Sequence, residues 1–308
     1  MNQNPLISII VPSYNHGHLI HRALNSILAQ TYLYWEVIII DNHSSDETEK
    51  IVSNFSENRF KFYKINNNGV IAASRNLGIK KALGEWVAFL DSDDWWEPEK
   101  LDKAINYALK KNADLVFHNL KIVRKNYSPF GRSIGFYDHS KSAFDNLLYA
   151  GNSIPNSSVV IKKSILQAVN LISEDKSKIS WEDYDCWLKV SKLTNNFAYL
   201  DENLGFYWLG GGNISNPYRT LKNLESIYLE YISALSIPPP FWFSHSLASA
   251  LMQCGYYKDS FNILRKTTLK NISALNRLKY YIRYAQSFIL KQTSNATYKN
   301  MKTFVAII

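Results

Sequence analysis

The sequence is poor in cysteine and contains no long uninterrupted apolar run. Its 308 residues include only two cysteines, Cys186 and Cys254, which cannot build a disulfide framework and lack metal-ligand spacing. No cationic-apolar leader precedes Leu6, and no apolar run approaches the roughly 18 residues that a membrane-spanning helix needs. These absences predict a cytoplasmic protein, either soluble or peripheral on the inner face of the cell membrane.

Nucleic-acid motifs are also absent: there is no zinc finger, RNP sequence or helix-turn-helix with a basic recognition face. The net charge is +9 and lies at the C-terminal end. From Lys222 onward, 11 Lys and Arg stand against 3 Asp and Glu, a balance of +8 that leaves +1 for residues 1–221. A basic helical segment favours an anionic membrane surface as partner, although a solvated helix face has the same composition. We expect no nucleic-acid partner.

Short apolar strands alternate with segments of helical periodicity through the first 120 residues. Near-continuous apolar strands of this kind indicate a mostly parallel sheet that helices cover on both faces. Residues 19–28 have an apolar stripe at helical spacing, and capping residues around Asp46 open another helix. The predicted strands span residues 6–11, 37–40, 60–65, 86–90 and 114–117.

After residue 120 the pattern becomes irregular, as is typical of a segment that builds a substrate pocket. Residues 156–161 predict one late strand, and residues 180–190 predict a helix. From about Tyr218 the composition is helical, with a break at Pro238-Pro239-Pro240. The sequence therefore predicts an α/β domain over residues 1–217 and a basic helical region over residues 218–308.

Polar clusters follow three of the predicted strands: Pro12-Ser13-Tyr14-Asn15, Asp41-Asn42-His43-Ser44 and Asp91-Ser92-Asp93-Asp94. Ligands of open parallel sheets bind beyond the carboxyl ends of the strands, so these clusters should line one cleft. Asp91 and Asp93 project to one side of an extended chain and can face one cation, such as Mg²⁺ or Mn²⁺. The alternative is a charged turn, because the residues from Asp94 to Pro98 look like a helix entry with Asp94 as its cap.

Two further groups of residues can carry chemistry. Gly69 allows a tight loop before a helix that contains Arg75 and Asn76, and Arg75 can bind a diphosphate, or else can face solvent. Glu182 and Asp183 open the helix of residues 180–190. Asp183 can act as a general base at the cleft rim, or can fold back on its own helix start in a capping box with Ser180.

The chain resembles family 2 glycosyltransferases, which have the GT-A fold, over roughly residues 6–215. Several ordered motifs carry this resemblance, and motifs in the right order are far more specific than a single one. They are residues 9–15 with 24–32, residues 36–46, residues 73–78, Asp91-Ser92-Asp93 and Glu182-Asp183.

The resemblance implies an inverting transfer of a sugar from a nucleotide-sugar donor, UDP-linked, to a hydroxyl of a glycan or glycolipid acceptor. Bacterial surface polysaccharide or lipopolysaccharide synthesis is the implied setting. Asp183 is the implied base, with Glu182 as second candidate, and Asp91 and Asp93 are the implied ligands of Mn²⁺ or Mg²⁺. The implied donor-binding residues are Pro12, Ser13, Tyr14, Asn15, Asp41, Asn42, Arg75, Asn76, Asp91 and Ser92.

Two departures from the family pattern stand out. Asn42 occupies a position where the family often has a second aspartate, so an amide that both donates and accepts meets the nucleobase. Residues 209–215 are glycine-rich where many relatives have an arginine and a histidine, and their backbone N–H groups can cradle phosphate.

Two other functions stay open. A nucleotidyltransferase would need a glycine- and lysine-rich first loop, which residues 12–15 do not supply. A catalytically silent nucleotide-sugar-binding membrane adaptor would not need both the Asp91/Asp93 and the Glu182/Asp183 pairs.

Overall fold

The computed structural model describes residues 4–55, 57–124, 129–210, 216–235, 237–269 and 273–292. The chain divides into two compact units. The first unit consists of residues 1–147, 152–176 and 182–213, and the second of residues 148–151, 177–181 and 214–308. The second unit thus includes two short internal segments besides the C-terminal region. The domain boundary at residue 217 stays a prediction.

The first unit is built on a sheet with the strand order β3-β2-β1-β4-β8-β6-β9-β5, in which β7 pairs with β6. The first four strands are mutually parallel, and β8 is antiparallel to both β4 and β6. The five predicted strands are confirmed. The strands are β1 (Ile7–Ser13), β2 (Trp35–Asp41), β3 (Phe60–Lys64), β4 (Trp86–Phe89), β5 (Trp95–Trp96), β6 (Leu115–Val123), β7 (Pro129–Ile134), β8 (Val160–Lys162) and β9 (Phe197–Trp208).

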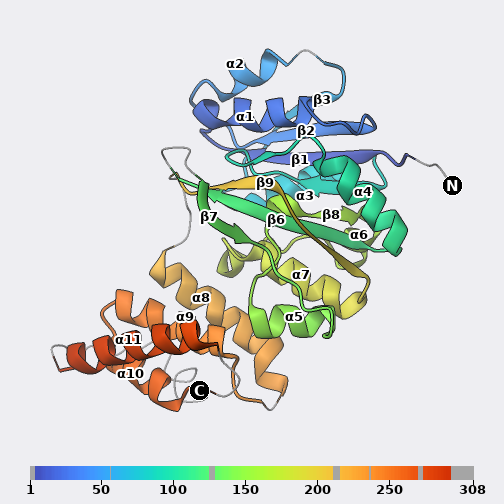
Figure 1. Cartoon of the computed structure of the whole chain (residues 1–308). Helices are drawn as coiled ribbons and strands as arrows, with labels where there is room; N and C mark the ends of the chain where they lie inside the picture. The colour runs from blue at the N-terminus through green and yellow to red at the C-terminus, as the bar shows by residue number, and fades with distance from the viewer. Residues whose placement is uncertain are drawn as a thin grey trace. The chain divides into compact units, whose positions relative to one another are not determined.

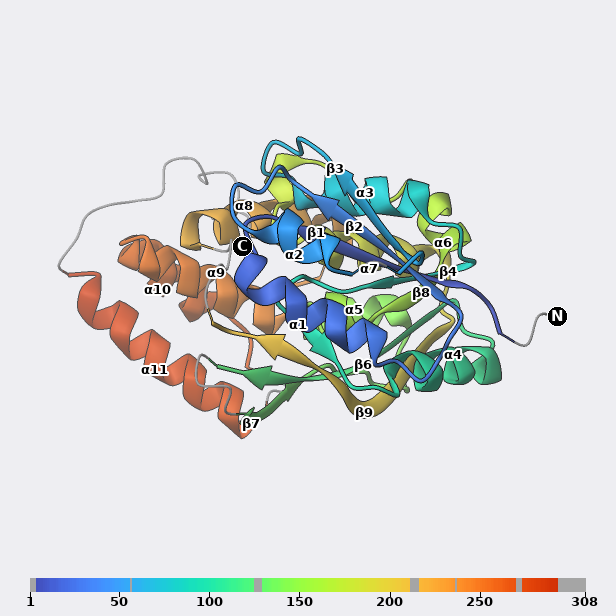
Figure 2. The ribbon, with the colours of Figure 1, turned by 90° about the horizontal axis from the view of Figure 1, so that it is seen from above.

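Helices cover both faces of the sheet (Figures 1 and 2). Figure 2 shows α1 (Gly17–Leu28) and α2 (Thr48–Ser53) on one face of β1 and β2, and α3 (Ile71–Lys81) on the other. The apolar stripe of α1 packs on the side chains of Ile7, Ile9 and Val11, which alternate along β1 toward that face. On the opposite face α3 approaches closely at Gly78, where a Cβ would lie 2.6 Å from Ile10 Cγ2. The helices predicted at residues 19–28 and after Asp46 are confirmed.

Further helices complete the first unit. α4 (Lys100–Lys111) contacts β6 and β9. The unit also contains α6 (Lys163–Ala168) and α7 (Glu182–Leu193), and α7 buries Tyr184, Trp187 and Leu188 as predicted. α5 (Ala143–Ala150) passes from the first unit into the second at Leu148.

Two sequence predictions fail in this part of the chain. Asp94 does not cap a helix, because β5 follows it and α4 begins only at Lys100, with Glu99 as its cap residue. Trp95 and Trp96 instead pair with Phe206 and Gly205 of β9, so pairing with a distant strand overrides a helix-like local signal. The late strand is also shorter than predicted, since residues Asn156–Ser158 form a 3-10 turn before β8.

The described part of the second unit is helical, as predicted. It contains α8 (Pro217–Ile227), two short helical segments at Tyr228–Ile232 and Ser233–Leu235, α9 (Phe241–Gln253), α10 (Tyr257–Lys266) and α11 (Ala274–Leu290). The proline run ends where α9 begins, with Pro240 as its cap residue. Within the described residues, no helix is long and apolar enough to cross a bilayer.

Candidate active site

Hydrogen bonds join the loops that follow β1 and β2 at the carboxyl edge of the sheet. Asp41 is buried, and its carboxylate accepts hydrogen bonds from the Ser44 backbone N–H at 2.8 Å and from Ser44 Oγ at 2.5 Å. Ser44 Oγ also accepts from the Asn15 N–H at 2.8 Å, and Asn15 Oδ1 accepts from the Ser45 N–H at 2.8 Å. Asn15 and His43 hold φ values of +52°, a left-handed conformation that clusters at functional sites. Asp41 and Asn15 therefore shape the loops in which the predicted donor site lies.

Asn42 presents a donor rather than an acceptor. Its Oδ1 accepts a hydrogen bond from the Asn67 N–H at 2.9 Å, while Nδ2 has no partner among the described residues. An aspartate at this position could only accept. The amide N–H groups of Asn42 are therefore suited to a carbonyl oxygen of a nucleobase.

The Asp91-Ser92-Asp93-Asp94 tetrad divides into side chains with different partners. Asp91 Oδ1 accepts from Arg75 Nη2 at 2.8 Å and from Asn156 Nδ2 at 3.2 Å. Ser92 Oγ lies 2.7 Å from His16 Nδ1. No side chain within the described ranges donates to the carboxylate of Asp93, whose pKa is raised to about 7 by burial and by the charge of Asp91.

Asp94 links the start of β5 to the turn before β8 and to the end of β9. It is 1% exposed, and its carboxylate accepts from Ser157 Oγ at 2.6 Å and from the Trp208 N–H at 2.9 Å. Burial, followed by the charges of Asp93 and Asp91, raises its pKa well above the ordinary value. Asp94 thus fixes the end of β9 next to the tetrad.

Arg75 joins the two groups of carboxylates. Its guanidinium donates from Nη1 to Glu182 Oε1 at 2.6 Å and from Nη2 to Asp91 Oδ1 at 2.8 Å, although Arg75 and Glu182 are 107 positions apart in the chain. The side chain is only 4% exposed, so the solvent-facing alternative for Arg75 is wrong. Burial lowers the pKa of Arg75, but Asp91 and Glu182 outweigh it and raise the pKa overall.

Glu182 and Asp183 at the start of α7 have different surroundings. Glu182 is 5% exposed and bound by Arg75. Asp183 is half-buried; its Oδ1 accepts from the Tyr184 N–H at 2.7 Å and its Oδ2 from Asn152 Nδ2 at 3.2 Å. Burial and the charge of Glu182 raise the pKa of Asp183 to about 7. A carboxyl with such a pKa, accessible to solvent, is suited to take up a proton at neutral pH.

The other predicted residues occupy two kinds of position. Tyr14 is exposed at the end of β1, while Pro12 and Ser13 are buried within it. Asn76 is 4% exposed and bonds to the segment of residues 172–174 through Ile172 and Glu174, so its polar atoms are engaged away from the carboxylate cluster. The donor-binding role of each of these residues stays a prediction.

Tyr207 is a candidate that the sequence alone does not reveal. Its neighbours Phe206 and Trp208 face an aromatic cluster in which the Arg22 guanidinium lies 3.7 Å from the centre of the Trp95 ring. Because side chains alternate along a strand, Tyr207 points to the other face of β9. There it lies near Asp94, Asp91, Asp93 and Asp183, whose charges add to burial in raising its pKa. Its hydroxyl has no hydrogen-bond partner among the described residues.

The glycine-rich segment is only partly described. Gly210 lies against the indole of Trp208, where a Cβ would overlap the ring, so the glycine here is required by the tryptophan before it. Residues 211–215, which carry most of the predicted phosphate cradle, lie outside the described residues.

Asp91 and Asp93 suit a divalent cation that is held partly by the protein and partly by a substrate. Among the described residues, no group of three or more His, Cys, Asp or Glu side chains is arranged to hold a metal ion. The carboxylate oxygens of Asp91 and Asp93 are nevertheless of the type that a hard divalent cation prefers, and no side chain among the described residues donates a hydrogen bond to Asp93. Mg²⁺ and similar ions are commonly held by one or two carboxylates together with substrate phosphates and water.

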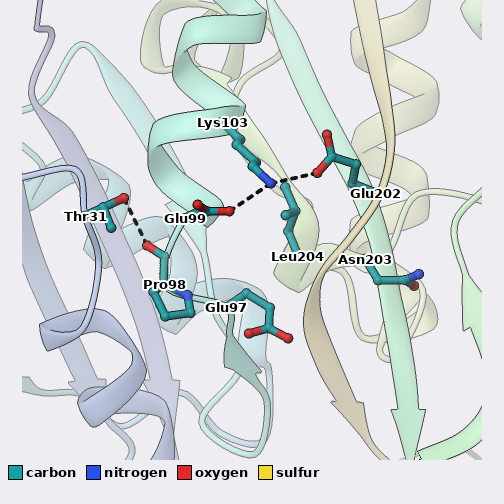
Figure 3. Close-up of a pocket in the computed structure, with 8 residues that line it drawn as sticks. All are labelled: Thr31, Glu97, Pro98, Glu99, Lys103, Glu202, Asn203 and Leu204. Carbon is teal, nitrogen blue, oxygen red and sulfur yellow. Dashed lines mark hydrogen bonds and ion pairs between the residues drawn. The ribbon is translucent and has the colours of Figure 1, made fainter.

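A separate pocket of 580 Å³ lies at the start of α4 and does not include any predicted site residue. Figure 3 shows Lys103 between Glu99 and Glu202, with Nζ–Oε2 distances of 2.8 Å and 2.9 Å. The pocket is lined by Thr31, Glu97, Pro98, Glu99, Lys103, Glu202, Asn203 and Leu204.

The carboxylates at the carboxyl edge of the sheet are thus joined through the buried Arg75 to the acidic pair at the start of α7. A family model described as Glycosyl transferase family 2 matches residues 8–168. The chain belongs to this family and is a glycosyltransferase, as its resemblance implied.

Individual relatives match a longer part of the chain than the family model does. The UDP-Glc:alpha-D-GlcNAc-diphosphoundecaprenol beta-1,3-glucosyltransferase WfgD of Escherichia coli is 34% identical over 232 residues, which are 74% of this chain and 87% of the relative. The structure is similar to that of S. aureus TarS 1-349 in complex with UDP-GlcNAc, with a TM-score of 0.61, 20% identity and coverage of 92% of this chain and 81% of that one.

A second solved structure adds to the assignment of the fold. The mannosyltransferase PcManGT from Pyrobaculum calidifontis, in complex with GDP-Man and Mn²⁺, has a TM-score of 0.58 at 16% identity and covers 99% of this chain and 84% of its own. Together these structures confirm the predicted GT-A fold.

Proposed function

We propose that the protein is an inverting, metal-dependent glycosyltransferase that moves a sugar from a UDP-linked donor to a hydroxyl of a glycan carried by a polyprenol diphosphate. The relative from Escherichia coli acts, by its name, on such a lipid-linked acceptor, and TarS binds UDP-GlcNAc. Surface polysaccharide or lipopolysaccharide synthesis at the inner face of the cell membrane is the proposed setting. The main support for this proposal is that Arg75 forms ion pairs with both Asp91 and Glu182. Asp91, on the proposed donor side, therefore lies beside the start of α7.

The proposed reaction is a single displacement at the anomeric carbon of the donor. The acceptor oxygen forms a bond to that carbon from the side opposite the diphosphate, while the bond from the carbon to the β-phosphate oxygen breaks and UDP leaves. The proton of the acceptor hydroxyl passes to a carboxylate oxygen of Asp183. One such displacement inverts the anomeric configuration.

Asp183 is preferred to Glu182 as the base for two reasons. Glu182 is buried and its Oε1 is held by Arg75, whereas Asp183 is half-buried and has a pKa of about 7. A base with its pKa near the operating pH combines a useful ionised fraction with a strong affinity for the proton. We therefore assign Glu182 and Arg75 to positioning and Asp183 to proton transfer.

The donor diphosphate is proposed to lie next to Asp91 and Asp93. Asp91 and Asp93 would hold a divalent cation, Mn²⁺ or Mg²⁺, which when bound would supply charge stabilisation for the departing diphosphate. The nucleobase is proposed to lie over the loops after β1 and β2, where Asn42 Nδ2 donates to a carbonyl oxygen of uracil.

A panel of nucleotide sugars tests this function. The full chain is incubated with UDP-, GDP- and dTDP-sugars, with Mn²⁺, Mg²⁺ or a chelator, and both thermal shift and release of the diphosphate are recorded. We expect a metal-dependent shift and slow hydrolysis with a UDP-sugar. With an acceptor present, proton NMR of the product reports whether the anomeric configuration is inverted.

The same panel separates a transferase from a silent binding protein. A donor response without any release of nucleoside diphosphate, even with acceptor, would favour a silent binding protein. A retained anomeric configuration in the product would refute the single displacement by Asp183.

Removing the hydroxyl of Tyr207 is expected to impair the reaction without harming the fold. The Tyr207→Phe variant should lower kcat/KM about tenfold, because an unpartnered hydroxyl beside the carboxylates is available to donate to substrate. Steady-state kinetics with the preferred UDP-sugar measure this loss.

Tyr199 on the same strand supplies the matched control. Its hydroxyl bonds to Asn119 Oδ1 at 2.7 Å and to Asp201 Oδ1 at 3.0 Å. The Tyr199→Phe variant should therefore keep its kcat/KM and lose about 1 kcal/mol of stability. A Tyr207→Phe enzyme as active as the parent would remove Tyr207 from the site.

A further inference from the structure

α11 is apolar on two opposite faces, although a helix at a protein surface needs only one. Toward the second unit's core it buries Tyr280 and Ser287, and the Tyr280 hydroxyl donates to the Leu264 carbonyl of α10 at 2.9 Å. The ring of Phe261 on α10 lies 5.1 Å from that of Tyr284. α10 thus covers one face of α11, and Figure 1 shows the two helices side by side.

The outer stripe of α11 lies on the opposite side. Positions 275, 282 and 289 are one heptad apart, and Ile282 follows the buried Tyr280 by two residues, which is about 200° around the helix. These side chains are largely exposed. The outer stripe comprises Leu275 at 61%, Leu278 at 57%, Tyr281 at 57%, Ile282 at 51% and Ile289 at 65% exposure.

Two exposed basic side chains, Arg277 and Lys279, flank the outer stripe, and no acidic side chain does. Residues 273–292 contain no Asp or Glu; their other two basic residues are Arg283, which is partly buried, and Lys291, whose Nζ lies 3.7 Å from the centre of the Phe261 ring on α10. A contiguous apolar surface with cationic flanks is the pattern of helices that lie in the interface of an anionic membrane. α11 carries too many charges to span a bilayer, and no described helix is long and apolar enough to do so.

We propose that the outer stripe of α11 docks the protein on an anionic lipid surface, with the helix axis parallel to the membrane plane. This inference deepens the proposed function and rests on it for its purpose, because an acceptor linked to polyprenol diphosphate resides in a membrane. The stripe inserts among the lipid headgroups, while Arg277 and Lys279 contact lipid phosphates.

Charge favours lipid over the other occupants of this face. A second copy of the chain would bring two basic helices together without an acidic residue on either, whereas helix pairs usually match opposite charges beside the apolar seam. Residues 293–308 contain Lys299 and Lys302 and no acidic residue, so they also lack a complement to α11. Anionic headgroups supply that complement.

Co-sedimentation of the full chain with vesicles tests the proposal. Vesicles of phosphatidylcholine alone are compared with vesicles that also contain phosphatidylglycerol, without donor or acceptor. We expect binding to the anionic vesicles that weakens with salt. Replacing Leu278 and Ile282 by glutamine should lower the partition coefficient roughly tenfold or more, because two apolar side chains no longer insert. The Arg277→Gln/Lys279→Gln variant should lower it roughly 30-fold at low salt.

Matched controls use exposed apolar and basic side chains elsewhere. Leu33 and Leu83, exposed at 70% and 71%, are replaced together by glutamine, and Lys110 and Lys111 at the end of α4 are neutralised in the same way. Both controls should bind vesicles as the parent does. All variants should melt at the parental temperature and hydrolyse the UDP-sugar in solution at the parental rate, because these positions lie outside the proposed site.

Three outcomes would overturn the inference. The first is that the parent chain does not bind anionic vesicles at low salt. The second is that the variant with glutamine at positions 278 and 282 binds as well as the parent. The third is that light scattering shows a dimeric parent and a monomeric variant. The last result would assign the face to a second copy of the chain. None of these outcomes bears on the transferase proposal, since the donor panel contains no vesicles.

Discussion

Replacement of Asp183 by asparagine is expected to lower kcat by roughly 10²–10⁴-fold, the contribution typical of general-base catalysis. Asparagine keeps the size of the side chain and can still accept from the Tyr184 N–H and contact Asn152, so the start of α7 should persist. Binding of the UDP-sugar, measured by calorimetry, should change little. Steady-state transfer to an acceptor measures the loss.

The pH profile of the parent enzyme should carry the signature of the same carboxyl. Its active form as a base is the carboxylate, and the pKa is raised to about 7 by burial and by Glu182. The rate should therefore fall about tenfold per pH unit below this value and level off above it.

The stability of the folded protein should fall as the pH rises, whereas the rate rises. The unfolded chain releases this proton near the ordinary pKa of 3.8, whereas the folded chain holds it to about 7. Stability from this group is thus lost as the pH rises across that window. The Asp183→Asn variant should accordingly melt at a higher temperature than the parent at pH 8, and the difference should shrink toward pH 4.

An equivalent change at another helix start serves as control. Asp102 lies in the first turn of α4, as Asp183 does in α7, but it is remote from the carboxylate cluster. The Asp102→Asn variant should keep both kcat and the pH profile. If Asp183→Asn turns over at the parental rate with its fold intact, Asp183 serves only as the helix cap.

Replacement of Arg75 by methionine is expected to cost about 3–5 kcal/mol of stability, because it leaves the buried carboxylate of Glu182 without its cation. The guanidinium is 4% exposed and its partners Glu182 and Asp91 are 7% and 27% exposed at their side chains. Burial of the unpaired charge of Glu182 dominates the loss. Urea unfolding followed by tryptophan fluorescence measures it.

Lys103 offers a control with the same pattern of contacts at the surface. It also bridges two carboxylates, Glu99 and Glu202, but its side chain is 37% exposed and theirs are 62% and 45% exposed. The Lys103→Met variant should lose far less stability than Arg75→Met, because solvent screens the charges of an exposed ion pair. Adding Glu182→Gln to Arg75→Met should recover part of the loss, since the unpaired charge is then removed. Equal losses for Arg75→Met and Lys103→Met would mean that the Arg75 bridge contributes no more than a surface pair.

The order of the elements could be read from the sequence because local patterns encode it. Ile7, Ile9 and Val11 alternate with Ile10 between two buried faces, and such a continuous apolar strand has few other stable environments. The polar residues after β1, β2 and β4 follow from the same logic, because the carboxyl ends of parallel strands meet at one edge.

The partners of individual polar side chains could not be read in this way. Asp94 has the local signature of a helix cap, yet it binds Ser157 and Trp208, which are 63 and 114 positions away. Asn76 stands in a family motif, yet its amide is bonded to Ile172 and Glu174. In both cases the tertiary fold selects one of several partners that local chemistry allows.

The sequence by itself therefore determined the α/β architecture, the helical C-terminal region and the family, because periodicity and ordered motifs are properties of neighbouring residues. Only the tertiary structure decided that Arg75 is buried between Asp91 and Glu182, that Tyr207 faces the carboxylates, and that α11 keeps a second apolar face. Burial and electrostatic partners depend on segments that meet across long stretches of chain, and no local pattern records which segments meet.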